Sequence, residues 1–132
     1  MTVPWPRDLT MEANAGASLA TGTLQTVLGR SQYTAVVQAV AFVPAGAVTG
    51  TSGNTRTLTL FNRGTGAGTV SVATLTLASG TNLADNTATA ITLATAANRV
   101  VAVGDVLEWE SAAVSSGLAD PGGLVVMTMA LR

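Results

Sequence analysis

Three acidic residues lie close together in a chain that is otherwise poor in charge: Asp105, Glu108 and Glu110, in the stretch VGDVLEWES. Glycoside hydrolases use paired carboxyl groups as acid and base, and calcium prefers several carboxylate oxygens as ligands. On a β-strand, Glu108 and Glu110 would project from one face with α-carbons about 6.6 Å apart. The stretch therefore has three interpretations: a catalytic pair, a calcium site that could include Asp120, or the exposed face of an ordinary strand.

The strand interpretation accounts for the most residues. The acids of a glycosidase flank the scissile bond from opposite sides of a cleft, which neighbours along one strand cannot easily do, and the spacing does not match an EF-hand loop. Gly104 and Asp105 suit a tight turn into the strand. Leu107 and Trp109 would then enter the core, while the two glutamates face water or an arginine of a neighbouring subunit. We therefore predict no catalytic residue, metal or cofactor site.

Composition removes most other catalytic chemistry. The 132 residues include no histidine, lysine or cysteine. Histidine is the commonest general base and metal ligand, and a serine or threonine nucleophile needs a neighbouring base to activate it. Without cysteine there is also no disulfide or thiolate. The sequence therefore predicts a protein that is not an enzyme.

Charge and loop motifs argue against nucleic acid, nucleotide and membrane partners. The net charge is −1, and the six arginines are spread along the chain with no basic run that could neutralise phosphates. Gly64, Gly66 and Gly68 precede a strand pattern, whereas a dinucleotide fingerprint opens a helix. Uncharged stretches are interrupted by Gly, Pro, Asn and Thr, which predicts no membrane segment despite a mean hydropathy of +0.46. We expect neither nucleic acid nor membrane as a partner.

The elements that would position these residues are β-strands. Alternation of Thr and Leu over residues 55–61 recurs over 70–78, with a Gly-rich turn between, so these two segments are predicted to form a hairpin. Turn residues separate the remaining segments, and Asp120-Pro121-Gly122-Gly123 suits a type II turn. The predicted fold class is all-β, a single compact β-sandwich or jelly-roll-like domain. The other strands are predicted at residues 32–43, 88–93, 105–112 and 124–131.

The first 30 residues follow a different pattern. Pro4 and Pro6 push the residues before them toward extended backbone, so Trp5 is predicted to lie on a stiff arm. Residues 11–29 mix helix and strand signals and are interpreted as one edge strand. The predicted organisation is an extended N-terminal arm with a possible edge strand over residues 1–30, followed by the β-sandwich domain over residues 31–132.

Three motifs, in order, carry a resemblance to a known family: Asn62-Arg63-Gly64 ending a strand, Gly104-Asp105 before Leu107-Glu108-Trp109, and residues 117–123, GLADPGG, before the last strand. Together they cover about residues 55–131. In this order, and in a lysine-free chain rich in Ala and Thr, they resemble small head decoration (cement) proteins of tailed double-stranded DNA bacteriophages.

The resemblance implies a structural virion protein that binds the outer surface of a phage capsid and stabilises the lattice of major capsid subunits. It implies the major capsid protein as partner, a homo-oligomer with a trimer favoured, synthesis in the host cytoplasm and a final place on the capsid surface. The alternative is a carbohydrate-binding or fibre module of a phage tail. The predicted protein-interface residues are Pro4, Trp5, Pro6, Arg7, Glu108 and Glu110, with Trp5 as an anchor because tryptophan is common in binding hot spots.

Overall fold

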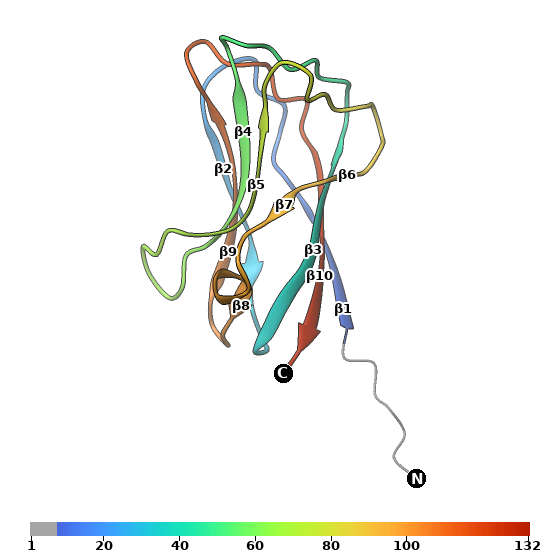
Figure 1. Cartoon of the computed structure of the whole chain (residues 1–132). Helices are drawn as coiled ribbons and strands as arrows, with labels where there is room; N and C mark the ends of the chain where they lie inside the picture. Colours follow the sequence, from blue (N-terminus) through green and yellow to red (C-terminus); the bar gives the residue numbers. More distant parts are fainter. Residues whose placement is uncertain (1–7) are drawn as a thin grey trace.

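A computed structural model describes residues 8–132 as an all-β domain. The strands are β1 (Asp8–Asn14), β2 (Leu24–Arg30), β3 (Ala35–Pro44), β4 (Arg56–Asn62), β5 (Val70–Leu77), β6 (Thr89–Ala90), β7 (Thr92–Leu93), β8 (Val100–Val101), β9 (Val106–Ala113) and β10 (Gly123–Leu131), with a short 3₁₀ helix η1 (Ala96–Arg99). They form two antiparallel sheets that pack face to face (Figure 1). The predicted all-β sandwich is confirmed.

The strand order is that of a jelly roll. The first sheet runs β1-β10-β3-β6, with β8 also paired to β3, and the second runs β2-β9-β4-β5-β7. Each sheet thus interleaves strands from the beginning, middle and end of the chain, and β4 and β5 form the one long hairpin within a sheet. Two interlocked Greek keys give this order. β1 and β2 form the edges of the two sheets on the same side of the sandwich.

The β4–β5 hairpin has the predicted two-sided pattern. Leu58 and Leu60 are buried against the first sheet. The threonines on the other face pair across the strands, with hydroxyl oxygens 3.0 Å apart for Thr57 and Thr76 and 3.1 Å apart for Thr59 and Thr74. β-Branched residues directly opposite one another stabilise an antiparallel pair. The hydroxyls therefore satisfy one another on the outer face of the second sheet.

Trp109 lies at the centre of the core. Its indole is fully buried and stacks on the Phe42 ring, with centroids 5.4 Å apart and ring planes inclined by 27°. Trp109 belongs to the second sheet and Phe42 to the first, so this contact joins the sheets. Leu107 is buried beside them. The predicted burial of Leu107 and Trp109 is confirmed.

Two turns that depend on glycine form where the sequence predicts them. Gly104 has φ +91° at the turn before β9, and Gly122 has φ +76°, the positive value that a type II turn requires at its third position. The Asp105 carboxylate accepts hydrogen bonds from the backbone N–H of Ala102 at 2.9 Å and the side-chain amide of Asn62 at 2.8 Å. The Gly-Asp pair therefore closes the turn and joins it to the end of β4.

The crossing between the sheets near residue 91 differs from the predicted single strand over 88–93. β6 pairs with β3 and β7 pairs with β5, so the segment passes from one sheet to the other. Ile91, between them, is buried and donates its backbone N–H to the Val40 carbonyl at 2.8 Å. Residues 96–101, expected to be a turn, form η1 and β8. Alternation over a short run cannot show where a chain changes sheets.

The segment before residue 31 contributes two edge strands, where the sequence analysis expected one. β1 pairs with β10 over its whole length, and β2 pairs with β9. Both alternate half-buried and exposed side chains, and DLTMEAN alternates polar and apolar residues throughout, a strand signal that the single predicted edge strand over residues 11–29 leaves out. The predicted boundary at residues 30 and 31 falls at the end of β2, and as a division into arm and domain it stays a prediction.

Arg56 joins several loops at the end of the sandwich opposite the start of β1. Its guanidinium is almost fully buried and donates to the carbonyls of Leu118, Gly22 (3.0 Å) and Ser111 (3.1 Å). Burial lowers the pKa of Arg56 from its ordinary value, and the charge of Asp120 partly offsets this. One side chain thus connects the segment before β2, the end of β9 and the segment before β10.

Replacing the central tryptophan tests this account of the core. We expect Trp109→Ala to lower the free energy of unfolding by about 3–5 kcal/mol, because it removes the contact with Phe42 and leaves a cavity between the sheets. Urea denaturation followed by circular dichroism measures the change. Val103→Ala, at an exposed valine, is the control and should change stability by less than about 0.5 kcal/mol. Equal stabilities for the two variants would contradict the central role of Trp109.

Candidate functional site

Glu108 and Glu110 lie on the outer face of the second sheet, as predicted, and are bound by residues of the same chain. Nη2 of Arg63 lies 2.6 Å from Oε1 of Glu108 and 3.7 Å from Oε2 of Glu110. The Gln25 side-chain amide donates to Oε2 of Glu110 at 2.7 Å. The two carboxylates are therefore partners of one arginine from the β4–β5 turn. That they also contact another protein stays a prediction.

The surface around this cluster is polar and rich in hydroxyls. The Arg63 guanidinium lies over the Phe61 ring at 4.3 Å from its centroid and so covers this aromatic ring. The paired threonines of β4 and β5 continue the face beyond Glu110, which lies beside Thr59 in the register. We call this surface the hydroxyl face. Its polar groups largely bind one another.

The acids that could have formed a calcium site are not brought together. Asp105 is engaged in its own turn, and Asp120 is buried near Arg56, where it accepts the backbone N–H of Gly122 at 2.8 Å. Within residues 8–132, no group of three or more acidic, histidine or cysteine side chains is placed to hold a metal ion. Glu108 and Glu110 share one side of a strand with no carboxyl group opposite, unlike the acids of a glycosidase.

The outer face of the first sheet is mainly apolar, in contrast to the polar hydroxyl face. Val125, Met127 and Met129 alternate into the core along β10, so the residues between them must point outward. In the register these outward residues lie beside apolar residues of β3. We call the apolar part of this surface the apolar patch, and its members are Val36, Ala41, Val43, Leu124, Val126 and Ala130. All six are half-buried in the isolated domain. Thr128 and Gln38 interrupt the patch between Val126 and Ala130.

The apolar patch is bordered on one side by polar side chains. β1 presents Asp8, Thr10, Glu12 and Asn14 outward, with Glu12 beside Val126 and Asp8 beside Ala130. Strands that are apolar on both faces are typical of sheets covered on both sides. The signal is present in the sequence as the nearly continuous apolar runs AVVQAVAFVP and GLVVMTMAL, but the sequence analysis took both as ordinary strands and missed the second face.

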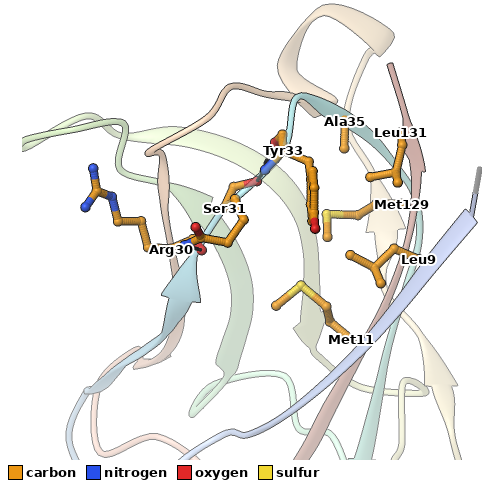
Figure 2. A pocket seen from close by; sticks show the side chains of 9 residues that line it. Leu9, Met11, Arg30, Ser31, Tyr33, Ala35, Met129 and Leu131 are labelled. Carbon is orange, nitrogen blue, oxygen red and sulfur yellow. Dashed lines mark hydrogen bonds between the residues drawn. The ribbon is translucent and has the colours of Figure 1, made fainter.

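A small apolar pocket lies between the sheets at the open side of the sandwich, near the start of β1. Its cavity volume is about 100 Å³. Figure 2 shows Leu9 and Met11 of β1, Met129 and Leu131 of β10, and Tyr33 of the β2–β3 connection around one space. Arg30 points away from it and donates to the Gly104 carbonyl at 3.2 Å. The pocket walls are therefore apolar, apart from the Tyr33 hydroxyl and the nearby Ser31 and Gln32.

The remaining predicted interface residues, Pro4, Trp5, Pro6 and Arg7, lie outside the described residues. In the part of the chain that the structure covers, no helix has the length and apolar character needed to cross a membrane.

Comparisons with known proteins give little further information. No protein-family description matches this chain, and no curated protein matches it either. Among solved structures, a chain from the structure of infectious bursal disease virus, Gx strain, aligns with 96% of this chain at 11% sequence identity and a TM-score of 0.42. This chain spans about a third (32%) of the length of that viral chain.

A neutral substitution tests the role assigned to Glu108. We expect Glu108→Gln to lower the free energy of unfolding by about 1 kcal/mol, because the ion pair with Arg63 is mostly shielded but still borders solvent. The loss should shrink in 1 M salt, which screens the wild-type pair. Thermal unfolding at low and high salt measures it, with Asp85→Asn on an exposed loop as control. A salt-independent loss, or none, would show that the pair does not hold the hydroxyl face together.

Proposed function

We propose that this chain is a structural virion protein that binds the outer surface of a phage capsid and stabilises the lattice of major capsid subunits. The observation that carries the proposal is the apolar patch on the first sheet. The jelly roll is a fold that viral capsid proteins use, although lectins and cupins share it. The motif resemblance over residues 55–131 supports the phage decoration role specifically.

The contrast between the two outer faces supports a permanent partner on one side. The hydroxyl face satisfies its polar groups internally, with Arg63 bound to Glu108 and threonines bound to threonines. Within residues 8–132, the apolar patch has no such partners. Burying it against another protein would remove apolar area from water at a gain of about 25 cal/mol per Å², and few charges would have to be desolvated. A capsid lattice offers many such contacts per particle.

In this proposal the patch faces the capsid and the hydroxyl face remains toward solvent. The partner is the major capsid protein, the location is the capsid surface after synthesis in the host cytoplasm, and the protein acts as a homo-oligomer, with a trimer favoured. No catalytic step, cofactor or nucleic acid is part of the role. Pro4, Trp5, Pro6 and Arg7 remain predicted contact residues.

The alternative, a carbohydrate-binding or fibre module of a phage tail, has weaker support. Sugar recognition by a sheet commonly needs an aromatic ring open to the ligand. Trp109 is fully buried, and Phe61 lies beneath the Arg63 guanidinium. Tyr33 is exposed, but its ring forms a wall of a pocket of only about 100 Å³, whereas ligand pockets commonly measure roughly 300 Å³ or more.

A charge placed in the apolar patch tests the proposal. Purified protein should bind capsids that lack decoration protein and raise their resistance to heat. We expect Val126→Glu to weaken this binding by about tenfold or more, because an uncompensated carboxylate would be buried beside Glu12. Co-sedimentation with capsids measures binding, and differential scanning calorimetry measures capsid melting.

The matched control is Val114→Glu, at an exposed valine after β9. It should bind capsids as the wild type does. Both variants should remain folded, with Val126→Glu somewhat less stable because its carboxylate lies opposite Glu12. If wild-type protein does not bind capsids at micromolar concentration, the capsid role is wrong. If Val126→Glu binds as well as Val114→Glu, the capsid contact lies elsewhere than the apolar patch.

A further inference from the structure

The apolar pocket has a wall chemistry suited to an aromatic side chain. Met11 and Met129 contribute thioethers, and Tyr33 contributes a ring face. Methionine sulfur makes favourable contacts with aromatic rings, and two aromatic rings stabilise each other when offset or edge-to-face. A cavity of about 150 Å³ holds a whole benzene molecule. A pocket of about 100 Å³ would therefore enclose part of a ring and leave the rest at its mouth.

The sequence contains one aromatic residue that could supply this ring. It has five aromatic residues in all. Phe42 and Trp109 stack in the core, Phe61 is covered by Arg63, and Tyr33 is already part of the pocket wall. The fifth is Trp5.

We propose that the indole of Trp5 from a second copy of this chain occupies the pocket formed by Leu9, Met11, Tyr33, Met129 and Leu131. Trp5 stands three residues before Asp8, where β1 begins beside the pocket, so the segment between them spans at most about 10 Å. Pro4 and Pro6 favour extended backbone on both sides of Trp5. To reach its own pocket, the chain would have to reverse direction within the few residues between Trp5 and β1, which the fixed φ of Pro6 disfavours, whereas a pocket on a second copy requires no such reversal.

This inference rests on the homo-oligomer of the proposed function and names the contact that joins its copies, and it is tested without a capsid, so that its failure is distinguishable from failure of the capsid role. Insertion of the N-terminal segment of each copy into the next would link copies at the open side of the sandwich, where β1 and β2 are edge strands. It would also cover Leu9 and Met11. The prolines reduce the entropy lost when the segment is ordered, which favours docking.

Disulfide trapping distinguishes a second copy from the same chain. The protein contains no cysteine, so introduced cysteines form the only bonds. Val3→Cys places a thiol two residues before Trp5, and Gln32→Cys places one at the pocket. An equal mixture of the two single variants, oxidised under native conditions, should yield a reducible two-chain product several-fold in excess of a control mixture of Val3→Cys with Val114→Cys.

Two outcomes would overturn the inference. One is a two-chain yield no greater than in the control mixture. The other is a Val3→Cys, Gln32→Cys double variant that closes its disulfide within one chain and runs at monomer mass, which would place Trp5 in its own pocket.

Tryptophan fluorescence provides an independent test that needs no cysteine. Trp109 is shielded from solvent, so emission quenched by iodide reports on Trp5. We expect the quenchable fraction to be small at high protein concentration and to rise on dilution. Tyr33→Ala should shift the midpoint of that rise to about tenfold higher concentration, as for loss of a binding hot spot, whereas Val103→Ala should not. A quenchable fraction that does not depend on concentration would contradict docking between copies.

Discussion

The contact between Trp109 and Phe42 determines how the rest of the domain is arranged. Each residue belongs to a different sheet, and their rings lie 5.4 Å apart in the centre of the core. Because side chains alternate along a strand, placing Trp109 inward also places Glu108 and Glu110 outward. The same alternation from Phe42 places Ala41 and Val43 on the opposite outer face. The core contact thus sets which side chains each surface presents.

The two outer faces differ in polarity, and so they differ in whether a partner would stabilise them. On the second sheet, hydroxyls pair with hydroxyls and Arg63 binds both glutamates, and Val27, beside Glu108, is an apolar side chain exposed on this face. On the first sheet, the outer faces of β3 and β10 are apolar apart from Gln38 and Thr128, and within residues 8–132 the polar row of β1 borders them. In a monomer the apolar patch stays in contact with water and contributes no burial energy. Covering it with another protein surface would remove that apolar area from water and stabilise the complex.

The alternation of polar and apolar residues along the chain predicts much of the fold. The repeated Thr and Leu of residues 55–61 and 70–78 predicted the hairpin, and the order of Leu107, Glu108 and Trp109 predicted which way each side chain points. Features that depend on distant residues could not be predicted. Arg63 binds glutamates 45 and 47 positions away in the chain, and Arg56 binds carbonyls from three separate segments. No local sequence pattern predicts such distant partners. An apolar run such as AVVQAVAFVP likewise does not indicate which surface covers its second face.

The central claim is that the apolar patch, rather than the hydroxyl face, contacts the capsid. Electron cryomicroscopy of capsids incubated with the wild-type protein tests this directly, since the two faces lie on opposite sides of the sandwich. The account predicts density for a jelly roll on the outer surface, with β3 and β10 toward the shell and the β4–β5 hairpin toward solvent. A bound domain with β4, β5 and β9 against the shell, or capsids without added density, would contradict it.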